Sequence, residues 1–257
     1  MRFRTATPAF AALVLAIASL VFTACGSKNK AQPSKGTLQL QFENVVGTQA
    51  LALGQTYTTA DGDPFTVSKL NYYISNIRLT KADGSEWAEP ESYHLVKHDQ
   101  TSTRTIALQQ VPTGNYTAIR FTIGVDSTRN VSGAQAGALD PLNDMFWTWN
   151  TGYIFLKLEG TSPRAANGQL VFHIGGFRAP HNTIRTVSPP LPAGALLQVR
   201  ADKAATVYYK ADVLKLFSGP HPVRFAELSN TMGGAAAVRV ANNYAAGMFR
   251  IDHVHAD

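Results

Sequence analysis

The sequence predicts an all-β protein, an antiparallel immunoglobulin-like β-sandwich with long loops and a short C-terminal helix. Three observations predict it: apolar and polar residues alternate in many short segments, turn residues separate these segments, and one Ala-rich segment lies near the C-terminus. Because successive side chains of a strand point to opposite faces, alternation indicates strands with one buried face. Many short strands with turns between them are typical of a sandwich rather than of an alternating α/β fold.

The first strand is expected from Thr37, where Leu38 and Leu40 alternate with polar residues. Turn residues such as those at 61–64 separate the later strands. The further segments expected to contain strands are residues 50–57, 65–79, 93–98, 104–111, 116–125, 153–160, 169–177, 183–187, 196–201 and 207–217. Residues 235–248 are Ala-rich and are expected to form the helix, because Ala has the highest helix propensity.

Residues 1–24 are expected to be a lipoprotein signal peptide. Arg2 and Arg4 precede an apolar run at 11–22, which is too short to span a membrane and suits the core of a signal peptide. Small residues then precede Cys25, which is similar to the bacterial lipobox, where the cysteine is acylated and becomes the new N-terminus. The alternative is a plain secretory signal with a chance cysteine.

The expected location is the cell envelope, with a lipid anchor at Cys25. The residues that follow it lack the Asp associated with inner-membrane retention, which favours the outer membrane, facing the periplasm. Residues 25–36 are polar and contain Gly, Pro, Ser and Lys, so they are expected to be a flexible tether. Residues 37–257 show no internal repeat and no change of composition, so they are expected to form one domain.

Charge and cysteine content exclude several function classes. Removal of residues 1–24 leaves 21 Lys and Arg against 17 Asp and Glu, a net charge of +4 without a long basic run, so nucleic-acid binding is not expected. Cys25 is the only cysteine, which excludes a disulfide, a thiolate metal site and cysteine catalysis once it is acylated. The sequence also lacks the G-x-S-x-G, phosphate-loop and H-E-x-x-H motifs, so no enzymatic activity is expected.

Residues 124–152 form a long segment with little periodicity, and such loops are often functional. Trp147 and Trp149 lie two positions apart, so in an extended chain both indoles face the same side. They either close the sandwich core or face a ligand or redox partner. The Asp and Asn side chains of this segment either cap turns or bind calcium, although their spacing does not match an EF-hand loop.

Three histidines are candidate metal ligands. His173 lies on the strand face opposite Phe172 and Ile174, and Gly175 and Gly176 permit a close backbone approach just beyond it. His253 and His255 point the same way in extended backbone, an arrangement that can chelate copper, nickel or zinc. Against metal binding, a single strand histidine is usually structural, and a terminal segment frays. Loop and strand-edge histidines, including His181, have weaker claims.

Several motifs resemble those of the MbnP-like copper-binding proteins, in consistent order from about Leu38 to the C-terminus. These motifs are Phe65–Ile77, Phe121–Asp126, Gly137–Pro141, Met145–Phe155, Lys157–Gly160, Phe172–Gly176 and Met248–His255. The resemblance implies an envelope β-sandwich protein that binds copper. It also implies a partner, an MbnH-type di-haem cytochrome c peroxidase-like enzyme that oxidises a tryptophan of its substrate protein to kynurenine.

On this chain the resemblance assigns the modified or ligand-lining role to Trp147 or Trp149. It assigns the metal to His173 and to the His253 and His255 pair. Indole is a poor metal ligand, whereas kynurenine offers an aniline nitrogen and a ketone, and imidazole suits copper in both common oxidation states. Two other hypotheses stay open: a carbohydrate- or protein-binding surface module at the two tryptophans without metal, and an enzyme.

Overall fold

The computed structural model describes residues 1–3, 34–133, 135–147 and 152–256. The chain divides into two units, 1–32 and 33–257, and every element below belongs to the second. Strands β1 to β8 are Lys35–Val46, Gln49–Ala50, Thr56–Thr58, Pro64–Lys81, Glu86–Ala88, Tyr93–Lys97, Thr105–Pro112 and Gly114–Ile123. Strands β9 to β16 are Phe146–Trp147, Gly152–Thr161, Gln169–Gly175, Arg185–Val187, Leu197–Val199, Ala205–Asp212, Asn230–Thr231 and Phe249–Ala256. The α-helices α1 to α3 are Ser127–Asn130, Leu214–Phe217 and Gly234–Gly247, and the 3₁₀ helices η1 to η3 are Thr101–Arg104, Gly137–Leu139 and Pro141–Asn143.

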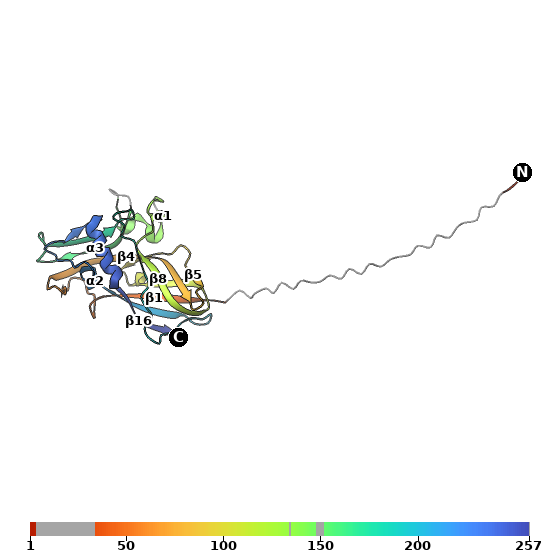
Figure 1. Cartoon of the computed structure of the whole chain (residues 1–257), viewed down its shortest axis with the longest axis horizontal. Helices are drawn as coiled ribbons and strands as arrows, with labels where there is room; N and C mark the ends of the chain where they lie inside the picture. Colours follow the sequence, from red (N-terminus) through yellow and green to blue (C-terminus); the bar gives the residue numbers. More distant parts are fainter. Residues whose placement is uncertain (4–33, 134, 148–151, 257) are drawn as a thin grey trace. The chain divides into compact units, whose positions relative to one another are not determined.

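Two sheets make up the domain (Figure 1). In the smaller sheet the order is β16-β14-β1-β2, and β7 also pairs with β1. In the larger sheet the order is β12-β8-β4-β10-β11-β15, with the short strands β3, β5 and β6 added on β4, β13 on β8 and β9 on β10. The all-β, sandwich-like prediction is therefore confirmed.

The prediction of a wholly antiparallel sandwich is wrong at two pairs. β1 runs parallel to β14, with Leu38 opposite Ala205 and Val45 opposite Asp212, and β11 runs parallel to β15. Alternation of apolar residues shows that a strand buries one face, but it does not identify the neighbouring strand or its direction. The pairing does not by itself establish an immunoglobulin-like topology.

The core lies between the two sheets and is rich in aromatic rings. Phe42 of β1 stacks on Tyr209 of β14 with ring centroids 5.0 Å apart. Its edges meet Tyr72 and Phe121 of the larger sheet at 6.4 and 6.1 Å. These rings are fully or almost fully buried, and edge-to-face geometry of this kind adds to the stabilisation from burial.

The predicted helix at 235–248 is confirmed as α3, displaced by one residue at each end. Ala237, Val240, Ala241 and Tyr244 are buried, a spacing that places them on one face of the helix. The Tyr244 hydroxyl donates a hydrogen bond to the Thr183 carbonyl at 2.7 Å. α3 also packs on α2 (Figure 1), so the C-terminal helix is held against the larger sheet by tertiary contacts.

Two other boundaries differ from the prediction. β1 begins at Lys35, so the last two residues of the predicted tether at 25–36 belong to the sheet. A Cβ at Gly36 would lie 2.0 Å from the Arg200 carbonyl oxygen, so the chain is already packed there. Residues 214–217 form α2 instead of continuing the strand expected over 207–217. Cys25 and the signal segment lie outside the described residues, except for 1–3.

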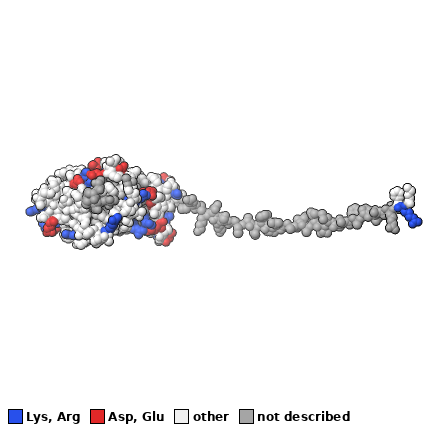
Figure 2. All heavy atoms as spheres, turned by 90° about the horizontal axis from the view of Figure 1, so that it is seen from above, with Lys and Arg blue, Asp and Glu red and all other residues white. Residues whose placement is uncertain are grey.

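The charges of the surface are mixed. On the face seen in Figure 2, acidic and basic side chains lie near one another, with uncharged surface between the groups. This agrees with the dispersed charge predicted from the sequence. None of the helices in the described ranges is both long and apolar enough to cross a membrane.

Candidate functional site

Trp147 forms part of the wall of a cavity of about 690 Å³ at one end of the larger sheet. It is the last residue of β9, which pairs with β10 so that Trp147 lies opposite Gly152. The side chain is buried, with 5% of its surface exposed. The other residues that line the cavity are Val131, Gly152, Gly175, Gly176, Phe177, Arg178, His181, Met232, Gly233 and Gly234.

Glycines allow the indole to lie directly on the backbone. A Cβ at Gly175 would lie 2.7 Å from Cη2 of Trp147 and 2.6 Å from the Tyr153 carbonyl oxygen, distances that real Cβ atoms do not adopt. Gly233 approaches the same indole edge, with φ of +111°. The predicted close backbone approach beyond His173 is therefore confirmed, and its partner is Trp147.

An aromatic cluster supports Trp147 on the side away from the cavity. Trp147 belongs to a buried group that includes Tyr73, Met145 and Tyr153. The Tyr73 and Tyr153 rings meet edge to face at 5.7 Å, and Phe146 meets Tyr153 at 5.1 Å. Trp147 thus both closes a core and lines a cavity, the two alternatives that the sequence left open. Trp149 lies outside the described residues.

Polar side chains of the long segment hold the chain that leads to β9. Asp126 caps α1 by accepting a hydrogen bond from the Arg129 backbone at 3.1 Å, and Asp140 caps η3 by accepting from Leu142 at 2.9 Å. Asn130, which is buried, accepts from the Tyr153 backbone at 2.9 Å. These residues cap turns, as one of the two alternatives predicted.

Lys157 fastens the same segment to β10. Its ammonium group lies 2.8 Å from Oδ2 of Asp144 and also donates to the Asp144 carbonyl. Only 3% of the Lys157 side chain is exposed, so this pair is a stronger constraint than an exposed salt bridge. Since Asp144 immediately precedes Met145, the pair fixes the entry into β9.

His173 lies on the outer face of β11, opposite Lys157 of β10. Its Nε2 is 2.8 Å from Oε1 of Glu159, and 13% of its side chain is exposed. Burial lowers the pKa of His173 below its ordinary value of 6.5, and the nearby Lys157 charge lowers it further, whereas the hydrogen bond to Glu159 raises it. His173 therefore favours the neutral imidazole, the form that binds metals.

His253 and His255 lie on β16, at the edge of the smaller sheet. They pair with Tyr208 and Thr206 of β14, so they share a face as predicted. The His253 ring stacks on Tyr208 at 4.2 Å, and its Nδ1 lies 2.9 Å from Asp252. His173 and this pair thus lie on different sheets, and the described residues contain no group of three His, Cys, Asp or Glu placed to share a metal ion.

His181 and Met232 line the cavity beside Trp147, and neither was a leading candidate from the sequence. His181 follows β11 in a loop, and Met232 follows β15, about fifty residues later in the chain. The Gly175–Gly176 pair was a signal for a close approach, but sequence alone does not say which later residues meet it. The parallel pairing of β11 with β15 brings Met232 there.

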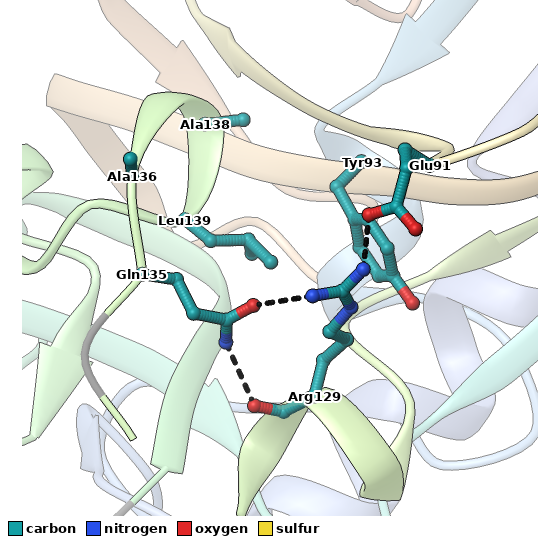
Figure 3. A pocket seen from close by; sticks show the side chains of 7 residues that line it. All are labelled: Glu91, Tyr93, Arg129, Gln135, Ala136, Ala138 and Leu139. Atoms are coloured by element: carbon teal, nitrogen blue, oxygen red, sulfur yellow. Dashed lines mark hydrogen bonds and ion pairs between the residues drawn. The ribbon is translucent and has the colours of Figure 1, made fainter. Parts of the chain in front are cut away.

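A second cavity, of about 460 Å³, lies beside α1 (Figure 3). The Arg129 guanidinium lies 5.2 Å from the centroid of the Tyr93 ring and pairs with Glu91. It also donates to the Gln135 side chain at 3.2 Å, and Gln135 donates back to the Arg129 carbonyl at 2.9 Å (Figure 3). Arg129 thus links both walls of this cavity and orients the loop around α1.

Comparison with known proteins gives a family and a related structure. A family model described as MbnP matches residues 35–233. Among solved structures, the chain is similar to MbnP from Methylosinus trichosporium, with 15% sequence identity and a TM-score of 0.49 over 86% of this chain and 98% of that chain. A comparison with curated proteins finds no match. The matched range includes Trp147, His173, His181 and Met232 and ends before β16.

We expect Gly175→Ala to displace Trp147 and to lower the free energy of unfolding by about 1–3 kcal/mol, because the added methyl group overpacks a filled contact. Urea unfolding and tryptophan emission measure the two effects, and the emission change should disappear in a Trp147→Phe background. Gly247→Ala is the matched control, since its Cβ would meet only the Lys215 side chain at 3.9 Å. Wild-type stability and emission in Gly175→Ala would contradict the packing described.

We expect NMR titration to give His173 a pKa below 6.5, and a still lower value in Glu159→Gln, because the hydrogen bond that favours the charged ring is weakened. Lys157→Met should shift the pKa upward. Because the folded pKa is depressed, the neutral ring contributes stability above pH 6.5 that is lost as the pH falls through the folded pKa. The free energy of unfolding should therefore fall more steeply with acidification in wild type than in His173→Gln. A His173 pKa above 6.5 would refute this.

Proposed function

Since this chain belongs to the MbnP family, we propose that it is a copper-binding protein of the cell envelope. The family match covers most of the domain, including both walls of the cavity beside Trp147. The observation that carries the proposal is the placement of Trp147: it is fixed by Gly175 and the aromatic cluster, and one side of it lines an open cavity. A tryptophan held in this way is within reach of a metal without loosening the core.

The donors around the cavity fit copper. His181 offers an imidazole and Met232 a thioether, whereas the described lining contains no Asp or Glu. Imidazole and thioether groups suit copper, and hard cations such as calcium and magnesium need oxygen ligands. His173, His253 and His255 are the histidines proposed from the sequence, and each is also able to bind copper as the neutral imidazole.

Oxidation of Trp147 or Trp149 by an MbnH-type di-haem peroxidase is part of the proposal. Opening of the indole at its C2–C3 bond, with peroxide as the oxidant and loss of the formyl group, leaves an aniline nitrogen and a ketone. At position 147 these groups would face the cavity, where the indole edge now lies between Gly175 and Gly233. The protein is then a binding partner and substrate of an enzyme, and not itself an enzyme.

The envelope location is proposed from the first 25 residues. The positive start, the apolar run and Cys25 favour export followed by acylation, with the outer membrane as the site of attachment. Acyl chains hold a protein at a membrane through burial of their methylene groups, and stable attachment takes more than one chain. The structured domain begins at Lys35, so about ten residues separate the anchor from β1.

A metal-free binding module is the second candidate function. The observation that favours it is the volume of the Trp147 cavity, about 690 Å³, which lies within the range of small-molecule sites. Trp147 and Phe177 would then offer aromatic surface to a carbohydrate or peptide. Binding of such a ligand at equal affinity with and without copper would support this function.

We expect the peptide that contains Trp147 and Trp149 to carry the mass of kynurenine when the full chain is produced together with its di-haem peroxidase. Copper should copurify with the modified protein, and both results should be lost in a Trp147→Phe, Trp149→Phe double variant. Peptide mass spectrometry and elemental analysis are the measurements. Trp87→Phe is the control, because Trp87 lies in β5, away from the matching motifs. Unmodified tryptophan without copper uptake would eliminate the proposal.

We expect Cys25→Ser to move the protein from the membrane fraction to the soluble envelope fraction, since the thiol that carries the acyl chains is absent. Fractionation, with metabolic labelling by a fatty acid, measures the change. Ser27→Ala keeps the cysteine and serves as the control. Continued membrane attachment of Cys25→Ser would show that another anchor is present.

A further inference from the structure

We propose that the cavity beside Trp147 binds Cu(I) through the thioether of Met232 and the imidazole of His181. This rests on the proposed copper function and deepens it, because it names the oxidation state and two ligands that lie outside the histidines expected from the sequence. Both residues line the cavity together with Trp147. They come from separate loops that the larger sheet brings to the same place.

Both loops are fastened to the same end of β11. The Thr183 backbone donates to the Gly176 carbonyl at 2.8 Å, which closes the loop that carries His181. A Cβ at Gly176 would lie 2.7 Å from the His181 carbonyl oxygen, so this loop packs tightly on the strand end. On the other side, Thr231 pairs with Phe172 of β11 and Met232 follows immediately. The two donors are therefore positioned by one strand end.

Met232 is held at the mouth of the cavity rather than in the core. It is 41% exposed, although methionine is normally among the buried residue types. The Thr231 hydroxyl donates to the Gly233 carbonyl at 3.0 Å, which stabilises the turn around Met232. Gly233 in turn lies beside the Trp147 indole. An exposed thioether on a fixed turn above a buried indole is an available soft ligand.

His181 differs from the other histidines in its surroundings. His94, His173 and His253 each lie within 3 Å of a carboxylate oxygen. Within the ranges that the structure describes, no hydrogen bond or ion pair engages the imidazole of His181. The side chain is exposed at the cavity mouth, so both ring nitrogens are accessible to a ligand.

The charge around the cavity favours a monovalent soft ion. The described lining has no carboxylate, and it includes the cation Arg178, which lies over the Phe177 ring at 4.9 Å. A divalent ion would gain no compensating negative charge there and would be repelled by the guanidinium more strongly than a monovalent ion. Neutral thioether and imidazole donors select Cu(I) over zinc, calcium and magnesium.

The test measures Cu(I) binding to the full chain by competition with a coloured Cu(I) chelator under reducing conditions, together with copper X-ray absorption. Met232→Leu and His181→Ala are each expected to lower Cu(I) affinity at least about 10-fold, because loss of even an outer-shell partner costs that much. Wild type should show a sulfur scatterer at copper that Met232→Leu lacks. The matched controls are Met248→Leu in the core and His221→Ala in a distant loop, and both should keep wild-type affinity and the sulfur signal.

The outcomes separate this inference from the proposed function. If wild type binds Cu(I) but both cavity variants keep its affinity and no sulfur scatterer is seen, the assignment is wrong while the copper function stands. Loss of binding in His173→Ala or in a His253→Ala, His255→Ala double variant would then identify the true ligands. If wild type binds no copper in either oxidation state, with or without the peroxidase, both the assignment and the copper function fail.

Discussion

The indole of Trp147 lies in contact with the backbone of Gly175, and the architecture around the candidate site depends on this contact. It is possible only because position 175 has no side chain: a Cβ would lie 2.7 Å from the ring. The contact places β9 against the end of β11, and β9 in turn ends the long segment that begins at Gly124. The cavity exists because the indole fills the space between the strand end and the turn at Gly233 but does not fill the space beyond them.

The rest of the segment is arranged to keep that contact in place. Lys157 binds Asp144 just before β9, and Asn130 binds the Tyr153 backbone just after it. Both polar anchors are almost fully buried, so their hydrogen bonds are expensive to leave unmade. The aromatic cluster around Tyr153 closes the side away from the cavity. Trp147 is thus rigid on three sides and accessible on one, a geometry that suits a residue whose role depends on position.

The two sheets divide the histidines into different environments. His173 pairs with Glu159 on the outer face of the larger sheet, and His253 stacks on Tyr208 at the edge of the smaller one. His181 alone among the histidines shares a cavity wall with Trp147 in the described part of the chain. The proximity of a histidine to tryptophan is therefore set by the loop between β11 and β12, and not by the strand alternation that drew attention to His173.

Local patterning was sufficient for much of the fold. Apolar alternation identified most of the strands, because burial of one face of a sheet imposes a period of two on the residues themselves. The Ala-rich segment identified α3, and the face of β11 that carries His173 was predicted correctly. The family was also recognised from local motifs. In each case the information lies within a few neighbouring residues, where the sequence states it directly.

Only the tertiary structure decided which distant segments meet. The parallel pairing of β1 with β14 joins residues far apart in the chain, and that of β11 with β15 brings Met232 to the end of β11. Strand partners are chosen by the fit of whole faces and by loop closure, so a pattern within one strand does not name its neighbour. For the same reason the sequence by itself determined that Trp147 and Gly175 were unusual, whereas the fold decided that they touch and that His181 and Met232 stand beside them.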